Sequence, residues 1–555
     1  MDRIWLKSYP PGVPQTIDPA EYGSLVELFE KSIRAYGERP AFHCMGKTIT
    51  FSELDAHARD FGAWLQAKGL KKGARVALMM PNCLQYPVAM FGVLRAGCVV
   101  VNVNPLYTAR ELEHQVNDAG AEAIVILENF ASVLQQVRSR TPIKHVVVTS
   151  LGEMLGVKGL IVNLVVRKVK KMVPAYDLPG ALTFKQALAE GAGAKLSTPP
   201  LTHDDIAFLQ YTGGTTGVSK GAMLLHRNVI AALLQYKAWL GPAIGSERPV
   251  IITALPLYHI FSLTVNCLNM MAVGGENILI TNPRDIPGFV KELSRHRFTM
   301  ISGVNTLFNA LLNNPDFAKL DFSGLKFALG GGMAVQKVVA DRWKQVTGTT
   351  LIEGYGLTET APAATANPLN LAEYSGAIGV PMPSTDIELR DDSDKAVPLG
   401  EAGEVCIKGP QVMAGYWQRP EESANVLGSD GYLHTGDIGV MDAKGFIRIV
   451  DRKKDMIVVS GFKVFPNEIE QVVSMHPGVL ECAVVGVPDE HSGEVPKVYV
   501  VKKDPQLTEQ DVLEHCKREL TGYKRPKYVE FRADLPKTNV GKILRRALRE
   551  EKKAA

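Results

Sequence analysis

The chain has 555 residues, of which 46% are hydrophobic and 22% are charged, and its formal net charge at pH 7 is +4. This length is too great for one hydrophobic core, so several domains are expected. The composition is that of a globular protein rather than a disordered one, and the small net charge argues against nucleic acid as a partner.

Residues 74–127 alternate between buried-strand and helical patterns. They predict strands at 74–80, 98–103 and 123–127, and helices at 85–96 and 110–119. This alternation indicates βαβ units and a mostly parallel sheet. A second region of the same kind surrounds residues 251–360, where apolar strands run into glycine-rich loops at 330–332 and 353–356. Ligands of α/β sheets gather at the carboxyl ends of such strands.

Two apolar segments raise the question of a membrane. Residues 251–275 carry no formal charge, and they are long enough to span a bilayer. Proline, histidine, asparagine and a glycine pair interrupt them, so a buried interior segment is the favoured interpretation. Residues 159–176 are apolar and then strongly basic. They either lie on an anionic membrane surface or form a helix with a solvated basic end.

The pattern changes after about residue 385. Short alternating strands predict a small β-barrel-like subdomain, and the remaining residues predict a small α/β unit with a helix at 509–520 and a basic tail helix from about residue 541. The charged turn at 451–455 separates the two. We therefore expect domains at 1–451 and 452–555.

The cysteines and the N-terminus bear on the compartment. Seven cysteines are scattered without a CxxC pair, which argues against a disulfide framework or a structural zinc site and favours a reducing compartment. The first residues lack the apolar core of a secretory signal. A cytoplasmic protein is expected.

The stretch YTGGTTGVSKG, residues 211–221, has the composition of a phosphate-binding loop but does not fit the Walker pattern. Its glycines let backbone N–H groups approach an anion, and Lys220 adds a positive charge. It follows an apolar strand pattern and precedes a helical pattern at 222–234. This strand–loop–helix context favours an anion site over an ordinary turn.

Three further stretches each have an ordinary alternative. Thr358 and Glu359 follow an apolar strand, where the carboxylate is either a ligand for Mg²⁺ beside a polyphosphate or a capping residue. Asp437 lies in a Thr-Gly-Asp stretch, which suits two sugar hydroxyls or a simple turn. Lys537 and Lys542 flank a glycine turn, either as mobile cations or as the solvated start of a basic helix.

Together and in this order, YTGGTTGVSKG, GYGLTET, TGD, DRKKD and PKTNVGK resemble the signature set of the adenylate-forming superfamily, over residues 25–548. The segment at 430–455, with NVNPLYTARELEHQ, ALPLYHIF, GVNTLFNALL and GPQVMAGYWQRP, is similar to bacterial long-chain fatty-acid–CoA ligases. The resemblance implies that a fatty carboxylate attacks the α-phosphate of ATP, releasing pyrophosphate, and that the thiol of CoA then displaces AMP. Attack of one anion on another needs positioning and charge neutralisation more than acid–base chemistry.

The resemblance also assigns roles to residues of the large domain. It implies a grip on the β- and γ-phosphates by Tyr211, Thr212, Gly213, Gly214, Thr215, Thr216, Gly217, Val218, Ser219, Lys220 and Gly221. The adenine would be framed by the 330–332 loop with Gly331 and Gly332, and by Gly354, Tyr355 and Gly356. Thr358 would contact the α-phosphate, Glu359 would bind Mg²⁺, and Asp437 and Arg452 would bind the ribose. His259 would lie at the acyl entrance.

For the small domain, the resemblance implies a moving part. Lys542 matches the lysine that bridges the carboxylate and the α-phosphate, and with Thr358 and Glu359 it completes the expected catalytic set. Lys453 and Lys454 match a hinge. Rotation about this hinge would replace Lys542 by the segment that contains Gly461, Phe462 and Lys463, beside the CoA pantetheine.

Several alternatives stay open at this point. Some fatty-acid members have a tryptophan that gates the acyl tunnel after the pair matching Tyr258 and His259, and this chain has none there. A medium-chain or aryl acid–CoA ligase would share most of these motifs. A non-enzymatic, membrane-associated acyl-chain carrier would use the 159–176 segment. If this segment binds a membrane, the protein is expected to be peripheral on the cytoplasmic face of the inner membrane. The resemblance also implies that the protein can form a homodimer, because members of the family are often dimers.

Overall fold

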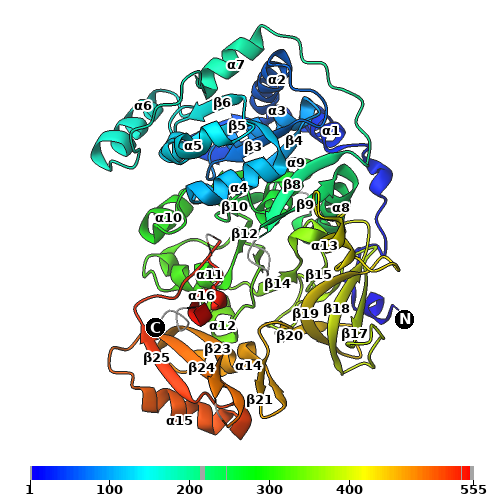
Figure 1. Ribbon diagram of the computed structural model, residues 1–555, viewed down its shortest axis with the longest axis vertical. Helices are drawn as coiled ribbons and strands as arrows, with labels where there is room; N and C mark the ends of the chain where they lie inside the picture. The colour runs from blue at the N-terminus through cyan, green and yellow to red at the C-terminus, as the bar shows by residue number, and fades with distance from the viewer. Residues whose placement is uncertain (1–2, 213–218, 246, 490, 539, 551–555) are drawn as a thin grey trace.

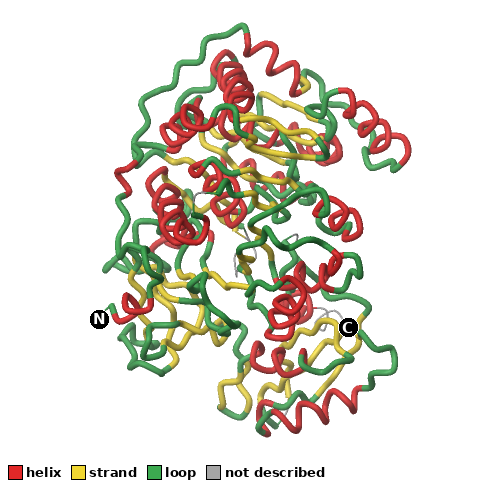
Figure 2. Tube along the Cα trace, turned by 180° about the vertical axis from the view of Figure 1, so that it is seen from behind, coloured by secondary structure: helices red, strands yellow, loops and turns green. Residues whose placement is uncertain are grey.

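Four sheets organise the chain (Figure 1). The computed structural model describes residues 3–212, 219–245, 247–489, 491–538 and 540–550. In Figure 1 a seven-stranded sheet and its helices lie at the top, a nine-stranded sheet lies in the middle, a four-stranded sheet lies at the right and the C-terminal unit lies at the bottom. Figure 2 shows the same layers from behind. The predicted mixed α/β fold with a smaller C-terminal domain is confirmed.

The seven-stranded sheet contains the first predicted βαβ region. Its strands, in spatial order, are β7 (Leu182–Thr183), β6 (His145–Thr149), β5 (Ala121–Leu127), β3 (Arg75–Met79), β4 (Val99–Asn102), β8 (Ile206–Thr212) and β9 (Lys220–Leu225). All neighbours pair in parallel except β8 and β9. Its helices are α2 (Phe51–Ala67), α3 (Gln85–Arg95), α4 (Ala109–Ala119), α5 (Ala131–Val137) and α7 (Phe184–Ala192).

The predicted start of the helix after the 211–221 loop, at residue 222, is wrong. Residues 220–225 form β9, and α8 (His226–Ile244) begins only after it. The backbone of β9 is bonded on both sides, since it pairs with β8 and also with a distant segment, through Met223 to Gly415 and Trp417 to Gly221. These long-range hydrogen bonds outweigh the local helical pattern. The described ends of the loop therefore lie on two antiparallel neighbouring strands, β8 and β9.

The nine-stranded sheet contains the second predicted region. In spatial order it consists of β16 (Val380–Pro381), β15 (Thr365–Ala366), β14 (Leu351–Tyr355), β13 (Phe327–Gly330), β12 (Met300–Gly303), β10 (Val250–Thr253), β11 (Glu276–Leu279), β1 (Pro40–Cys44) and β2 (Lys47–Thr50). The strands from β14 to β1 are parallel. Further helices of the large domain are α1 (Leu25–Tyr36), α9 (Asn269–Val273), α10 (Ile286–Leu293), α11 (Asn305–Leu312) and α12 (Lys337–Thr347).

The uncharged run at 251–275 lies inside the molecule. It continues from β10 into a π-helical segment, η6 (Ser262–Leu268), whose residues are all buried, and then into α9. Several polar side chains within it find partners, as when Ser262 donates to the carbonyl of Leu255 at 2.8 Å. Among the described residues, no helix combines the length and the apolarity needed to cross a bilayer. The interior interpretation of this run is confirmed.

The β-rich subdomain is a four-stranded antiparallel sheet of β17 (Asp386–Arg390), β18 (Ala402–Lys408), β19 (Leu433–Met441) and β20 (Ile447–Arg452), and α13 (Pro420–Ala424) lies between β18 and β19 in the chain. The C-terminal unit contains β21 (Ile457–Val459), β22 (Phe462–Val464), β23 (Val479–Asp489), β24 (Gly493–Lys502) and β25 (Tyr528–Arg532), with α14 (Pro466–Ser474), α15 (Glu509–Glu519) and α16 (Arg545–Glu550). The tail helix begins at Arg545 rather than near residue 541, because Lys537 and Ile543 pair in an antiparallel bridge just before it.

The chain passes from one sheet to the other between Arg452 and Ile457, where the hinge is predicted. Lys453 is held to the large domain, because its N–H donates to Gly436 at 2.9 Å and its Nζ lies 2.8 Å from Asp392. Burial, followed by the charge of Arg452, lowers the pKa of Lys454. The exact domain boundary and the rotation stay predictions.

Candidate active site

The Gly/Thr-rich loop connects the ends of β8 and β9, where Thr212 faces Lys220 in the antiparallel register. Of its predicted residues, Gly213, Gly214, Thr215, Thr216, Gly217 and Val218 lie outside the described residues. Tyr211 anchors the base of the hairpin, since its hydroxyl donates to Asp118 at 2.7 Å and its ring packs on Gly221. A Cβ on Gly221 would lie 3.0 Å from that ring.

Lys220 and Glu359 lie on either side of Tyr416. The Lys220 Nζ is 5.3 Å from the centroid of the Tyr416 ring and forms an ion pair with Glu422. The Tyr416 hydroxyl donates to Glu359 Oε1 at 2.7 Å. Sequence reasoning assigned no role to Tyr416 or Glu422, and nothing in their local pattern marks them. The structure thus brings the lysine of the loop close to the predicted metal carboxylate.

The predicted adenine loops meet where only glycine fits. Gly331 follows β13, and a Cβ on it would lie 3.1 Å from the ring of Phe261 and 3.2 Å from the carbonyl oxygen of Gly354. A Cβ on Gly356 would lie 1.3 Å from the carbonyl oxygen of Pro362. The close approach of the two strand ends explains Gly331, and the fold of the chain back to Pro362 explains Gly356. Thr358 and Glu359 follow at once in a 3₁₀ turn, η8 (Thr358–Thr360).

Tyr355, Asp437 and Arg452 form one cluster. Asp437 lies in β19 rather than in a turn, and it faces Arg452 of β20 in the antiparallel register. Arg452 Nε is 3.1 Å from Asp437 Oδ1, and the Tyr355 hydroxyl donates to Oδ2 at 2.6 Å. Burial, followed by the charge of Asp437, raises the pKa of Tyr355 well above its usual value, so this phenol stays protonated. Three predicted residues from three strands are therefore brought together.

Lys542 reaches this cluster from the small domain. Its turn is closed by the hydrogen bond from Thr538 N to the Lys542 carbonyl, at 2.6 Å, and docks through Thr306, whose hydroxyl donates to the Gly541 carbonyl at 3.0 Å. A Cβ on Gly332 would lie 3.0 Å from Lys542 Cε. Burial lowers the pKa of Lys542 to about 8; Arg452 acts in the same direction, and Asp437 and Glu359 oppose it.

His259 is a neutral imidazole in this structure. Burial lowers its pKa to about 3, and the charge of Lys542 contributes in the same direction. Its Nδ1 accepts a hydrogen bond from Phe261 N at 3.3 Å. Because a neutral ring beside an apolar wall suits an uncharged ligand better than an anion, this environment is compatible with an acyl entrance.

The structure does not bring Gly461, Phe462 and Lys463 to the other predicted residues. They belong to the exposed β21–β22 hairpin at the outer end of the small domain (Figure 1). Phe462 is 56% exposed and stacks on Tyr523, with ring centroids 4.8 Å apart. In this orientation of the two domains, Lys542 of the small domain faces the cluster.

Arg545 ties the helix after Lys542 to the strand before the hinge. Its Nη1 lies 3.1 Å from Asp451 Oδ1, and its Nη2 lies 2.7 Å from Glu470 Oε2. The side chain of Asp451 is fully buried and that of Arg545 is 15% exposed. Burial raises the pKa of both carboxyls, while Arg545 opposes the rise. This buried ion group was not predicted.

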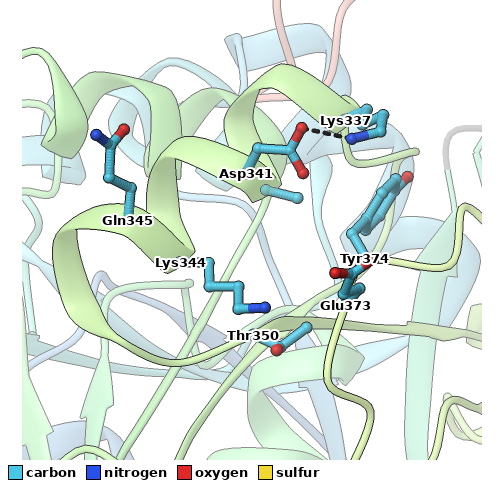
Figure 3. A pocket seen from close by; sticks show the side chains of 8 residues that line it. Lys337, Asp341, Lys344, Gln345, Thr350, Glu373 and Tyr374 are labelled. Atoms are coloured by element: carbon cyan, nitrogen blue, oxygen red, sulfur yellow. Dashed lines mark hydrogen bonds and ion pairs between the residues drawn. The ribbon is translucent and has the colours of Figure 1, made fainter.

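One surface cavity lies apart from this site (Figure 3). It has a volume of about 470 Å³ and is lined mainly by one side of α12 and the segment near Tyr374. None of the predicted nucleotide-binding residues lines it. Its charged groups neutralise one another in part, since Lys337 pairs with Asp341. We assign it no part in the chemistry.

Comparison with known proteins agrees with this arrangement. Residues 29–417 match the AMP-binding enzyme family, and residues 468–542 match the C-terminal domain of AMP-binding enzymes. The chain is 59% identical to a long-chain-fatty-acid–CoA ligase of Escherichia coli O6:H1, over 99% of this chain and 98% of that one. It is 54% identical to a ligase of the same name from Haemophilus influenzae, over 99% of each chain.

A solved structure shows the same fold. The anthranilate CoA ligase AuaEII, in complex with anthranoyl-AMP, superposes with a TM-score of 0.85 at 25% identity, covering 96% of this chain and 99% of that chain. The two matched domains follow one another in the expected order, and the cluster of Tyr355, Asp437, Arg452 and Lys542 lies where the domains meet. The chain belongs to the AMP-binding enzyme family.

Proposed function

We propose that the protein joins a long-chain fatty acid to CoA, with ATP as the energy source and acyl-AMP as the intermediate. The products are acyl-CoA, AMP and pyrophosphate. High identity to long-chain-fatty-acid–CoA ligases along almost the whole chain supports this substrate class. The observation that carries the proposal is the position of Lys542, which one domain presents to the carboxylate and hydroxyl cluster of the other.

In the first step the side chains position two anions. The β8–β9 hairpin and Lys220 hold the β- and γ-phosphates, the Gly331 and Gly356 loops enclose the adenine, and Asp437 accepts the ribose hydroxyls. Lys542 lies between the fatty carboxylate and the α-phosphate, which Thr358 also contacts. Its ammonium form lowers the repulsion between these groups, and this repulsion is the main barrier to in-line attack.

Glu359 suits a magnesium ion. Mg²⁺ is bound in such sites by one or two carboxylates together with the phosphates of the substrate and water. The hydrogen bond from Tyr416 fixes the orientation of this carboxylate near Lys220, where the phosphates are expected. When bound, the ion would neutralise charge on the leaving pyrophosphate.

The second step needs a different domain orientation. We propose that the small domain turns about Lys453 and Lys454 after the acyl-adenylate forms. This rotation withdraws Lys542 and brings the hairpin with Gly461, Phe462 and Lys463 toward the CoA thiol. The exposure of that hairpin in the present orientation leaves it free to pack elsewhere.

The two half-reactions test the role of Lys542 separately. Lys542→Ala is expected to nearly abolish fatty-acid-dependent exchange between ATP and pyrophosphate, and to spare thioester formation from preformed acyl-AMP. Lys537→Ala is the matched control, because this lysine of the same turn pairs with Glu481 and Asp534. Undiminished exchange in Lys542→Ala would refute the assignment. Absence of exchange with every fatty acid in the wild type would favour the acyl-chain carrier.

We further propose that α6 (Val157–Leu164) and η5 (Val165–Val169) rest on an anionic lipid surface. Figures 1 and 2 show α6 projecting from the body of the molecule. Several apolar residues of the two segments face solvent, with Val157 83%, Leu160 72% and Val169 72% exposed. The exposed lysines at 168, 170 and 171 follow directly. Apolar side chains beside lysines are typical of a segment that lies in the interface of an anionic bilayer.

Vesicle binding tests the contact. Changing Lys168, Lys170 and Lys171 to glutamine is expected to weaken partitioning to vesicles with anionic lipid, by about 1 kcal/mol for each charge. Arg167→Gln is the control, because Arg167 already pairs with the buried Glu128 at 2.7 Å. Equal partitioning of the triple variant and the wild type would contradict the proposal.

Two further proposals concern the cellular compartment of the protein and its oligomeric state. The seven cysteines are free and buried, which supports a cytoplasmic enzyme, here peripheral on the inner face of the inner membrane. The resemblance supports a homodimer. Light scattering of the purified chain distinguishes the dimer from a monomer.

A further inference from the structure

Two histidines and a glutamate converge on one point at the edge of the nine-stranded sheet. His43 lies in β1, Glu292 lies in the last turn of α10, and His296 follows that helix. The Nε2 atoms of His43 and His296 are 3.5 Å and 3.3 Å from the same oxygen, Glu292 Oε1. The three potential ligand atoms all lie within 4.8 Å of one another. The side chains are only 14–16% exposed.

Two of the three groups, His43 and Glu292, are held from behind. The Nδ1 of His43 lies 2.8 Å from the Thr48 hydroxyl, and Glu292 Oε2 accepts a hydrogen bond from Arg295 at 2.6 Å. Metal-binding imidazoles commonly bond their second nitrogen in this way, which fixes the tautomer and the ring orientation. The two imidazole rings meet edge to face, with centroids 4.6 Å apart and planes at 72°.

The state of His43 follows from its hydrogen bonds. Gly46 N lies 3.2 Å from His43 Nε2 and donates to it, which places the ring proton on Nδ1, toward Thr48. The single in-plane electron pair of Nε2 thus accepts from Gly46, and a metal ion at Nε2 takes the place of this hydrogen bond. An ion at this point also neutralises the Glu292 carboxylate. A second proton on an imidazole would neutralise it too, and the experiment below separates the two.

We propose that His43, Glu292 and His296 form a binding site for a divalent transition-metal ion of the zinc type. Two imidazoles and one carboxylate are ligands that zinc, cobalt and nickel accept, whereas magnesium and calcium prefer oxygen alone. Three protein ligands leave a further coordination position for water. The site is distinct from the proposed magnesium position at Glu359, because four strands of the sheet, β13, β12, β10 and β11, separate β1 from β14.

The site would tie two distant segments of the large domain. An ion held by His43 on one side and by Glu292 and His296 on the other links the β1–β2 hairpin to the end of α10. Because such an ion binds the folded chain, it raises the stability of this edge of the sheet. The expected effect is on unfolding, with the half-reactions unchanged.

Cobalt is the probe, because Co²⁺ in such a site absorbs visible light. The full chain, without an added histidine tag and freed of metal by chelation, is titrated with Co²⁺. One ion per chain is expected to bind, to be displaced by Zn²⁺ and to persist in excess Mg²⁺. His43→Ala and His296→Ala are expected to weaken this binding at least about tenfold, and Thr48→Val by about 10- to 100-fold. His57→Ala, on α2, is the matched control and should bind as the wild type does.

Thermal unfolding adds a second readout. Zn²⁺ is expected to raise the midpoint of the wild type and of His57→Ala, but not that of His43→Ala. Glu292→Gln, which keeps the shape of the side chain, covers the case in which an alanine variant fails to fold. Absence of saturable Co²⁺ binding in the wild type would overturn the proposal and leave a protonated histidine as the cation. Equal Co²⁺ affinity in the histidine variants would also overturn it.

Discussion

Replacing Thr306 by valine removes one hydrogen bond from the interface between the two domains and leaves the side chain nearly the same shape. The Thr306 hydroxyl belongs to α11 of the large domain, and its acceptor is the Gly541 carbonyl, next to Lys542. In the proposed second orientation this bond cannot exist, because the Lys542 turn has moved away. The substitution therefore disfavours the orientation seen here without touching the nucleotide-binding residues.

The expected magnitude follows from the value of one such bond. A neutral hydrogen bond contributes about 0.5–1.5 kcal/mol, so its loss lowers the equilibrium constant for this orientation about 2- to 13-fold. The rate of the first half-reaction falls by at most that factor, and by less if the orientation is strongly favoured at the outset. Thioester formation from preformed acyl-AMP should be unchanged or slightly faster.

The assay compares ATP–pyrophosphate exchange with thioester formation in the same preparation. Thr141→Val is the matched control, because the Thr141 hydroxyl also donates to a backbone carbonyl, that of Arg138 at 2.9 Å, but does so inside the large domain. It should leave both half-reactions unchanged. Equal losses of both half-reactions in Thr306→Val would refute the reasoning, since they would indicate general damage.

Three further predictions concern charge. Because the pKa of Lys542 lies near 8 and the ammonium form is the one that binds phosphate, kcat/KM for ATP in the exchange assay should fall above pH 8, by about tenfold per pH unit; a profile that stays flat to high pH would contradict this. Arg545→Met leaves the buried Asp451 without its cation and should lower the free energy of unfolding by about 3–5 kcal/mol in urea titrations; a loss below about 1 kcal/mol would show that the ion group is not needed. Tyr416→Phe frees the Glu359 carboxylate from its orienting donor, so the Mg²⁺ concentration for half-maximal exchange should rise about 10-fold; an unchanged Mg²⁺ dependence would separate Glu359 from the metal.

The strands and helices of the seven-stranded sheet could be predicted because their patterns are local. Residues 76–79 and 99–101 are apolar throughout and buried, as expected for central parallel strands. The prediction of a helix at 222–225 was wrong because the apolar spacing of this segment suits a helix. The hydrogen bonds that make it a strand come in part from residues 414–417. A pattern within one segment carries no information about such a distant partner.

The same distinction applies to the candidate active site, where motifs identified residues but not the contacts between them. Asp437 and Arg452 could be named from motifs, but their pairing depends on the register of β19 and β20, which no motif states. Tyr416 was missed because its role arises only where its loop crosses both β9 and η8. Gly461, Phe462 and Lys463 lie in the C-terminal unit, and their distance from Asp437 of the large domain depends on the domain orientation, which no motif states.

Arg452 is the last residue of β20, and Lys453 follows it as the first residue of the predicted hinge. Arg452, the expected partner of the ribose, and Lys453, the expected pivot, are thus consecutive residues, but only the backbone at Lys453 has to turn. In the proposed cycle the large domain would keep its hold on AMP, through Asp437 and Arg452, while the rest of the small domain swings past. The nucleotide would then stay bound in one place while the small domain moves around it. The acyl-adenylate therefore need not dissociate and rebind between the two reactions.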